Sequence, residues 1–230
     1  MVEIPLMKYQ VIIPARKGSK RFPRKNTHEL GGVPLFLHSV KYALEFFRPN
    51  EIWVNTDDTD IAEICKPFNV NVTIRPVHLG SDLTSTADVL EYQHRVFKLS
   101  GVICEAMILL QPTNPIRPFN LMTDVIFAFE RSSRNSVATF STLNKKFGSL
   151  KSGYFEPENY KPGQRMQDLD NFIFENGLIY ITKISSIEKG EIMTSDVLPF
   201  MVDSIESRID IDEIEDLYFA EYILNKHEKI

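Results

Sequence analysis

The strongest constraint on the fold is the alternation of strand-like apolar runs with helix-like segments over the first 130 residues. Short runs rich in β-branched residues predict buried strands, and helical spacing of apolar residues follows each run. This alternation is typical of a parallel, doubly wound sheet with helices on both faces. The predicted strands are Gln10–Pro14, Glu51–Asn55, Val70–Ile74 and Ala106–Leu110. One predicted helix begins at Pro34, and the others cover Asp58–Lys66, Thr86–Leu99 and residues 119–131.

The pattern changes near residue 142, where a polar stretch rich in glycine and proline runs to residue 170. A stretch of this length is usually functional or flexible, and it could be a disordered loop, a lid or a small hairpin arm. The length of the chain suits one domain over residues 1–230, with 142–170 as an insertion. Later strands are predicted at Ser136–Ser141, Leu178–Thr182 and Ser204–Ile211, and a closing helix at Glu213–Leu224.

Charge is distributed unevenly along a chain of ordinary globular composition, with 43% hydrophobic and 25% charged residues. The formal net charge of −5 opposes binding to nucleic acid by charge alone. A concentrated basic loop on an acidic protein instead favours a small polyanion such as a nucleoside triphosphate. That loop, residues 16–25, contains no acid and holds Arg16, Lys17, Lys20, Arg21, Arg24 and Lys25.

The basic loop directly follows the first predicted strand, in the sequence PARKGSKRFPRKN. Ligands of open α/β sheets bind at the carboxyl ends of the strands, so the loop stands where a ligand is expected. Gly18 is expected to permit a tight turn whose N–H groups face phosphate oxygens. Arg16 can hold phosphate with its planar fork, while Lys25 acts as a point charge. The loop matches neither the P-loop nor GxGxxG, and a solvated loop without a ligand is the alternative.

Three shorter motifs each have a functional and a structural interpretation. QPTNP, residues 111–115, suits recognition of ligand hydroxyls but also a rigid turn. FENG, residues 174–177, is first of all a turn signal. Asp210 and Asp212 would share one face of a strand, where two carboxylates suit Mg²⁺. The alternative is a charged strand end with Asp212 as the N-cap of the next helix.

Other features are ordinary. Cys65 and Cys104 are expected to be reduced thiols, because no Cys/His spacing for a metal site exists. The first ten residues lack the apolar core of a signal peptide, and no apolar run approaches 18 residues. We therefore expect no membrane contact and a cytoplasmic location.

Taken in order, the motifs resemble those of the CMP-N-acylneuraminate cytidylyltransferases, or CMP-sialic acid synthetases. The resemblance covers residues 9–225 and rests on ARKGSKRFPRKN, RP-x-x-L-x-SD at Arg75–Asp82, LLQPTNPIR, ENGLIYI and DID. It implies a three-layer α/β/α fold like that of the nucleotide-diphospho-sugar transferases. It also implies transfer of CMP from CTP to the anomeric hydroxyl of a sialic-type nonulosonic acid, with release of pyrophosphate. Mg²⁺ would be the cofactor, and 142–170 the dimerisation arm of a homodimer that serves surface polysaccharide synthesis.

The resemblance implies roles for individual residues. Arg16 and Lys25 would hold the triphosphate and act in catalysis, with help from Lys20 and Arg21 at the outer phosphates. Asp210 and Asp212 would carry Mg²⁺, and a metal on Asp210 would polarise the attacking hydroxyl. Cytosine and ribose would contact Asn26, Arg75 and Thr86, and the sugar would contact Gln111, Thr113, Asn176, Tyr180 and, from the arm of the other subunit, Arg165.

Several positions depart from the family pattern and leave the acceptor open. Lys17, Asn114 and Glu213 stand where relatives often have other residues, and Arg165 lies in a divergent segment. The acceptor could therefore be KDN, legionaminic acid, pseudaminic acid or KDO, and no general base can be named. A non-catalytic nucleotide-sugar-binding protein is less favoured, because the basic loop and both carboxylates are present. A nucleic-acid-binding module is opposed by the acidic balance and by the lack of interleaved aromatic residues.

Overall fold

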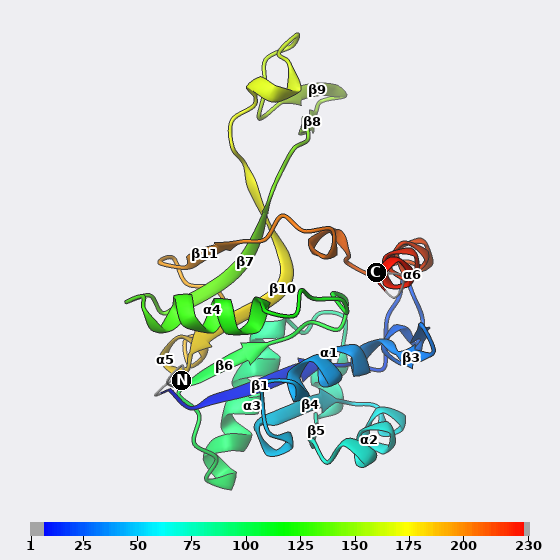
Figure 1. Ribbon diagram of the computed structural model, residues 1–230, viewed down its shortest axis with the longest axis vertical. Helices are drawn as coiled ribbons and strands as arrows, with labels where there is room; N and C mark the ends of the chain where they lie inside the picture. Colours follow the sequence, from blue (N-terminus) through cyan, green and yellow to red (C-terminus); the bar gives the residue numbers. More distant parts are fainter. Residues whose placement is uncertain (1–6, 228–230) are drawn as a thin grey trace.

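Seven strands form one central sheet in the computed structural model, which describes residues 7–227 (Figure 1). Their order is β11-β7-β10-β6-β1-β4-β5. Among the described strands of this sheet only β10 runs antiparallel to its neighbours, so the sheet is mostly parallel, as predicted. The bounds are β1 Tyr9–Pro14, β4 Ile52–Thr56, β5 Asn71–Ile74, β6 Ala106–Leu109, β7 Ser136–Thr142, β10 Ile173–Lys183 and β11 Leu198–Met201.

Alternate side chains of the central strands fill two apolar layers. Val11 and Ile13 of β1 enter one cluster, whereas Ile12 between them enters the other. The first cluster is covered by α1, α2 and α4, and the second by α3 and α5, which gives the predicted three-layer α/β/α class. The helices are α1 Leu35–Leu44, α2 Thr59–Cys65, α3 Thr86–Ser100, α4 Leu121–Glu130, α5 Ile184–Ile187 and α6 Ile214–His227.

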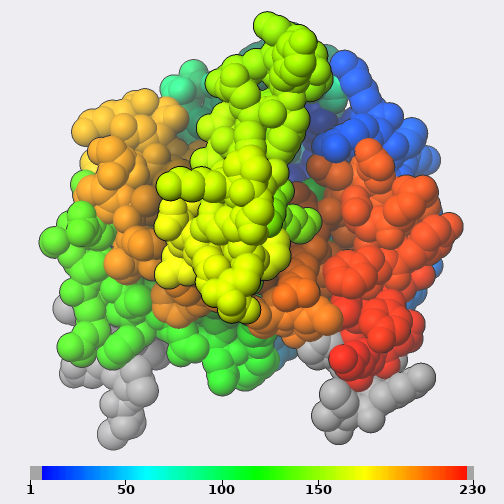
Figure 2. All heavy atoms as spheres, turned by 90° about the horizontal axis from the view of Figure 1, so that it is seen from above, coloured from blue at the N-terminus to red at the C-terminus, as the bar shows by residue number. Residues whose placement is uncertain are grey.

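The stretch between β7 and β10 projects from the sheet as an arm (Figure 1). The arm carries the antiparallel hairpin of β8, Gly148–Lys151, and β9, Tyr154–Pro157. Seen from above, it stands over the rest of the molecule with its sides exposed (Figure 2). Of the three forms open for this stretch, the structure has a hairpin arm.

A third apolar cluster lies beside the sheet and positions the C-terminal part of the chain. It joins α6 to the small ladder of β2, Glu29–Leu30, and β3, Val33–Pro34. Gly31 in the turn of this ladder has a φ of 57°, and a Cβ there would lie 2.5 Å from a methyl carbon of Leu224. Another residue would be strained by the positive φ and would have to displace the Leu224 side chain.

The predicted strand over Ser204–Ile211 is wrong. Residues Glu206–Arg208 form a 3-10 turn, and the place beside β7 is taken by β11. The alternation in the sequence has another cause, since Ile209 and Ile211 are buried against α6 in the third cluster. Over the described part of the chain, no helix combines the length and the apolar character that crossing a membrane requires.

Candidate active site

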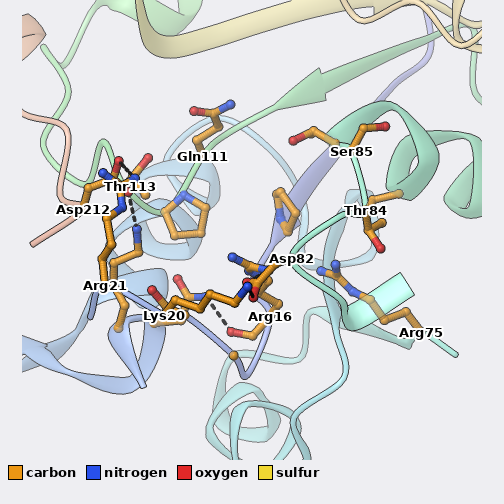
Figure 3. Close-up of a pocket in the computed structure, with 18 residues that line it drawn as sticks. Arg16, Lys20, Arg21, Arg75, Asp82, Thr84, Ser85, Gln111, Thr113 and Asp212 are labelled. Carbon is orange, nitrogen blue, oxygen red and sulfur yellow. Dashed lines mark hydrogen bonds and ion pairs between the residues drawn. The ribbon is translucent and has the colours of Figure 1, made fainter. Parts of the chain in front are cut away.

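A cavity of about 490 Å³ opens at the carboxyl ends of β1 and β6 (Figure 3). We call it the loop cavity, because the basic loop after β1 forms one wall. The segment between β5 and α3, the first turn of α3 and the QPTNP turn form the others. Ten of the residues that the sequence analysis assigned to the site line this cavity: Arg16, Lys20, Arg21, Lys25, Asn26, Arg75, Thr86, Gln111, Thr113 and Asp212.

The basic side chains of the loop cavity are paired with two carboxylates. Arg16 and Lys20 contact Asp82, with N–O distances of 2.7 and 3.1 Å. Lys25 Nζ lies 2.8 Å from Asp212 Oδ1, and Arg21 pairs with the same carboxylate. In Figure 3 Asp212 and Arg21 lie to the left, apart from Asp82 and Arg16 near the centre. A ligand with negative charge at both ends of the cavity would replace both carboxylates.

The basic loop is held by its own hydrogen bonds. Asn26 Nδ2 donates to the Arg16 carbonyl at 2.8 Å, and Lys25 Nζ donates to the Ile211 carbonyl at 2.7 Å. Arg24, with a φ of 57°, makes the sharp turn that was predicted at Gly18. Gly18 is not in the left-handed region and has open space beside it, so a ligand can approach its backbone closely.

Arg75 and the start of α3 form the opposite wall. Arg75 donates to the carbonyls of Asn55 and Leu79, and burial lowers the pKa of its guanidinium to about 10. Its Nε is buried and has no hydrogen-bond partner among the described residues. Thr86 is the first residue of α3, whose free N–H groups and N-terminal dipole favour negative charge.

Asn114 links three motifs by hydrogen bonds. Because relatives often have another residue at this position, we had expected it to affect the choice of sugar. Its Nδ2 donates to the carbonyls of Asn176 and Ile209 at 2.9 and 2.7 Å. The side chain is 1% exposed and lines neither cavity described here. Asn114 therefore holds the QPTNP turn, the FENG motif and the segment before Asp210 in fixed relative positions.

Asp210 and Asp212 come together without a strand. The amide of Ile211 between them donates to the Thr113 carbonyl at 2.8 Å, and the Thr113 hydroxyl donates to Asn114 Oδ1 at 3.2 Å. Loss of water around Asp210, together with the charge of Asp212, raises the pKa of Asp210. Hydrogen bonds and charges of Lys25 and Arg21 outweigh partial burial and lower the pKa of Asp212. Asp212 does not cap α6, because the Asp216 carboxylate accepts from the amides of Asp212 and Glu213.

A second cavity, of about 720 Å³, lies where the arm leaves the sheet, and we call it the arm-base cavity. Asn176 and Asp210 line it, whereas Tyr180 is buried and directs its hydroxyl to Glu175 Oε2 at 3.1 Å. Arg165 lies far along the arm, exposed and paired with Asp168 at 2.7 Å, and lines neither cavity. The residues expected around the sugar are thus divided, since Gln111 and Thr113 face the loop cavity.

Sequence reasoning missed several charged residues of the two cavities. Asp82 and Glu175 were inside quoted motifs but had no role, and Lys145 and Arg208 were not singled out. A signal existed for Arg208, which precedes Asp210 by two residues on the polar side of an alternating segment. No local pattern marks the others, because the arm and the sheet bring them together.

Comparison with known proteins supports an assignment to one family. A family model described as cytidylyltransferase matches residues 10–186. The CMP-N,N'-diacetyllegionaminic acid synthase of Legionella pneumophila is 31% identical, over 97% of this chain and 99% of its own length. An N-acylneuraminate cytidylyltransferase of Streptococcus agalactiae is 28% identical over 97% of this chain, which spans 57% of that protein. The pseudaminic acid cytidylyltransferase of Campylobacter jejuni is 27% identical, over 94% of this chain and 96% of its own.

Solved structures agree on the fold. A CMP:2-keto-3-deoxy-manno-octonic acid synthetase in complex with CTP superposes with a TM-score of 0.72 at 17% identity, over 96% of this chain and 99% of the other. A 4-diphosphocytidyl-2C-methyl-D-erythritol synthase superposes with a TM-score of 0.68 at 11% identity, over 95% and 99%. At these identities the likeness concerns the arrangement of the elements alone.

Proposed function

Because the chain belongs to the cytidylyltransferase family, we propose that it transfers CMP from CTP to the anomeric hydroxyl of a sialic-type nonulosonic acid, with release of pyrophosphate. The observation that carries this proposal is the loop cavity. Four basic side chains from one loop face it, and Arg75 and Thr86 line it across from them. Basic groups along one wall suit a triphosphate, and donors along the other suit a base and ribose.

The side chains would act by position and charge. Arg16 and Lys20 would take the outer phosphates in place of Asp82, and Arg21 would help them. Lys25 is buried and held at the Ile211 carbonyl, so its charge is fixed beside the place for the α-phosphate. Nucleotidyl transfer needs little covalent help from the protein, and fixed positive charge near the reacting phosphate lowers the barrier.

A magnesium ion fits the pair of Asp210 and Asp212. The described residues offer no group of three His, Cys, Asp or Glu side chains for a metal, but Mg²⁺ typically takes one or two carboxylates together with phosphates. The raised pKa of Asp210 indicates a carboxylate that a nearby cation would stabilise in its charged form. Bound there, Mg²⁺ would neutralise phosphate charge and polarise oxygen ligands.

The magnesium proposal is tested by titrating Mg²⁺ into metal-free protein with CTP present. Asp210→Asn should raise the Mg²⁺ concentration for half-maximal activity by about tenfold or more, because one of two carboxylate ligands is lost. Asp60→Asn, whose carboxylate pairs with Arg24 outside the loop cavity, should not. An unchanged Mg²⁺ requirement in Asp210→Asn would remove that residue from the metal site.

The acceptor is proposed from the names of the relatives and from the arm-base cavity. Relatives named for legionaminic, N-acylneuraminic and pseudaminic acids share the whole described fold region with this chain. The arm-base cavity adjoins the loop cavity at Thr113 and Asp210–Asp212, so an acceptor there would face the α-phosphate. Legionaminic acid, KDN, pseudaminic acid and KDO remain the alternative acceptors.

We also propose that the protein is a homodimer joined through its arm, and that it works in the cytoplasm, where CTP is available. The hairpin displays Leu150 at 78% exposure, Tyr154 at 77% and Phe155 at 56%. Apolar side chains gathered on a projecting element are typical of a surface that is covered by another chain.

The reaction is tested by measuring pyrophosphate release with CTP, Mg²⁺ and each acid in turn. The panel is N-acetylneuraminic acid, KDN, legionaminic acid, pseudaminic acid and KDO, with ATP, GTP and UTP as nucleotide controls. We expect turnover with CTP and at least one nonulosonic acid, and a loss of 100-fold or more in kcat for Lys25→Met. The control Lys41→Met, on the exposed side of α1, should keep full activity. Folded protein that is silent on the whole panel would refute the proposal.

A further inference from the structure

The arm-base cavity contains two basic residues that the proposed reaction has not yet used. Lys145 enters from the base of the arm, and Arg208 ends the 3-10 turn Glu206–Arg208. Glu175 and Asp210 are the acidic residues in the same lining, and polar groups such as Asn176 complete it. The cavity therefore contains both signs of charge within one space of about 720 Å³.

The two cavities differ in how their cations are neutralised. In the loop cavity, Arg16, Lys20, Arg21 and Lys25 each form an ion pair with Asp82 or Asp212. Among the described residues, Lys145 and Arg208 form no ion pair. Arg165, which was expected to reach a sugar carboxylate, is bound to Asp168 of its own arm. The unpaired positive charge in the arm-base cavity thus lies at Arg208 and Lys145.

The backbone around Arg208 directs its side chain away from the core. Ile209 and Ile211 are buried against α6, and the backbone at Ile209 is extended with a φ of −91° and a ψ of 114°. In an extended segment, residues two apart share a side and lie roughly 7 Å from each other. Arg208 and Asp210 are therefore neighbours on the exposed side, where both line the arm-base cavity.

The acidic side chains near Arg208 form no ion pair with its guanidinium among the described residues. The charge of Arg208 helps to lower the pKa of Asp203, but both oxygens of that carboxylate accept hydrogen bonds from Thr142. Glu175 accepts from the Tyr180 hydroxyl. The planar donor fork of Arg208 is thus available to a carboxylate that comes with a ligand.

We propose that Arg208, assisted by Lys145, binds the carboxylate of the acceptor acid and so sets the position of its attacking hydroxyl. The inference rests on the proposed function, because it supposes a 2-keto acid sugar as acceptor. In such a sugar the carboxylate and the anomeric hydroxyl are attached to the same carbon. A carboxylate held at Arg208 therefore places the hydroxyl toward Asp210 and the loop cavity. The anchor belongs to the same chain as the nucleotide site.

The test compares Arg208→Gln and Arg208→Lys with the wild type in steady-state kinetics. For Arg208→Gln we expect the KM of the acid to rise roughly 10- to 100-fold, as when a charged hydrogen bond is lost, while the KM of CTP stays unchanged. Arg208→Lys should recover part of the loss, because the charge returns without the fork. Arg134→Gln, an exposed arginine that lines neither cavity, is the matched control.

The methyl ester of the preferred acid separates a carboxylate contact from a general disturbance of the site. If Arg208 binds the carboxylate, wild type and Arg208→Gln should use the ester equally poorly. An equal penalty of Arg208→Gln on acid and ester would overturn the assignment, and so would an unchanged KM for the acid.

Binding without turnover distinguishes the failure of this inference from that of the proposed function. Saturation-transfer NMR with N-acetylneuraminic or legionaminic acid, in the presence of CMP, should detect the acid on the wild type but not on Arg208→Gln. Wild-type turnover with an unaffected Arg208→Gln variant would refute the inference alone. A wild type that neither binds nor converts any acid of the panel would refute the proposed function, and the inference with it.

Discussion

Asp82 and Asp212 pair, in the free protein, with the cations that we expect to bind the phosphates of a nucleotide. Asp82 holds Arg16 and Lys20 on one side of the loop cavity, while Asp212 holds Lys25 and Arg21 on the other. The charges of Lys20 and Arg16 lower the pKa of Asp82, so this carboxylate is ionised over the whole physiological range. Nucleotide binding must therefore break these ion pairs before it can gain from the same cations.

Replacement of Asp82 by asparagine should tighten CTP binding. The variant removes a competing carboxylate from Arg16 and Lys20, and we expect a decrease of a few-fold at most in the Kd of CTP, because exposed ion pairs contribute little. Calorimetric titration with CTP in the absence of an acceptor measures the effect. Asp60→Asn, which frees only Arg24 outside the cavity, should leave the Kd unchanged. Weaker binding in Asp82→Asn would instead assign Asp82 a direct contact with the nucleotide.

Asn114 should matter for stability more than for substrate choice. Asn114→Ala leaves the carbonyls of Asn176 and Ile209 without this donor in a buried place, and we expect a loss of about 2–3 kcal/mol in the free energy of unfolding. Urea denaturation provides the measurement. The matched control is Asn120→Ala, since the Asn120 side chain makes no capping hydrogen bond on α4. Equal stability of the two variants would contradict the role assigned to Asn114.

At the scale of elements, the arm is the part whose behaviour is easiest to isolate. Its hairpin is joined to the body only through the ends of β7 and β10, and its apolar residues are exposed. If these residues form the dimer contact, their loss changes the association of the chains without changing the central sheet.

The double variant Leu150→Ser with Phe155→Ser should therefore shift the protein from dimer to monomer in sedimentation velocity. Leu99→Ser, at a position 89% exposed near the end of α3, is the control and should remain dimeric. We expect the thermal unfolding of the body to keep a single cooperative transition in both. A wild type that sediments as a monomer, or a double variant that stays dimeric, would exclude the arm as the contact.

The sequence allowed the sheet to be predicted because its elements have local signatures. The apolar run of β6 and the helical spacing of α3 are each visible within one segment, and both were placed within one residue at their ends. The failure at Ser204–Ile211 has a physical reason, because burial of Ile209 and Ile211 against α6 produces the same alternation as a strand. Alternation of apolar and polar residues indicates which side of a segment is buried, but it does not indicate which element covers that side.

The site was predictable to the extent that its residues sit in motifs. Arg16, Lys25 and Gln111 follow strands whose carboxyl ends meet, so their gathering around the loop cavity was expected. Asp82, Lys145 and Glu175 could not be placed, because their positions depend on a loop and on the base of the arm. The joining role of Asn114 was also hidden, since its partners are 62 and 95 residues away in the chain.

For the whole molecule, the reactivity of the two thiols measures how readily the three-layer fold opens. Burial raises the pKa of Cys65 and of Cys104 to about 12, so neither is ionised near neutral pH. We expect both to react with Ellman's reagent at pH 8 far more slowly in the native protein than in urea, because the thiolate is the reactive form. Rapid labelling of the native protein would show that one of the layers opens readily. If Cys65 is labelled only after global unfolding, saturating CTP should slow its labelling further, because CTP would bind only the native state.

Asp82 and Asp212, the two carboxylates of the loop cavity, compete with incoming anions for the basic side chains. A single inorganic phosphate can satisfy the cations at one side only, and there it gains little over the carboxylate that it displaces. A chain of linked phosphates reaches both sides at once, and the second exchange then costs no further loss of translational freedom. We therefore expect small anions to bind the free protein weakly, and selectivity for the proposed nucleoside triphosphate to begin before any base is recognised.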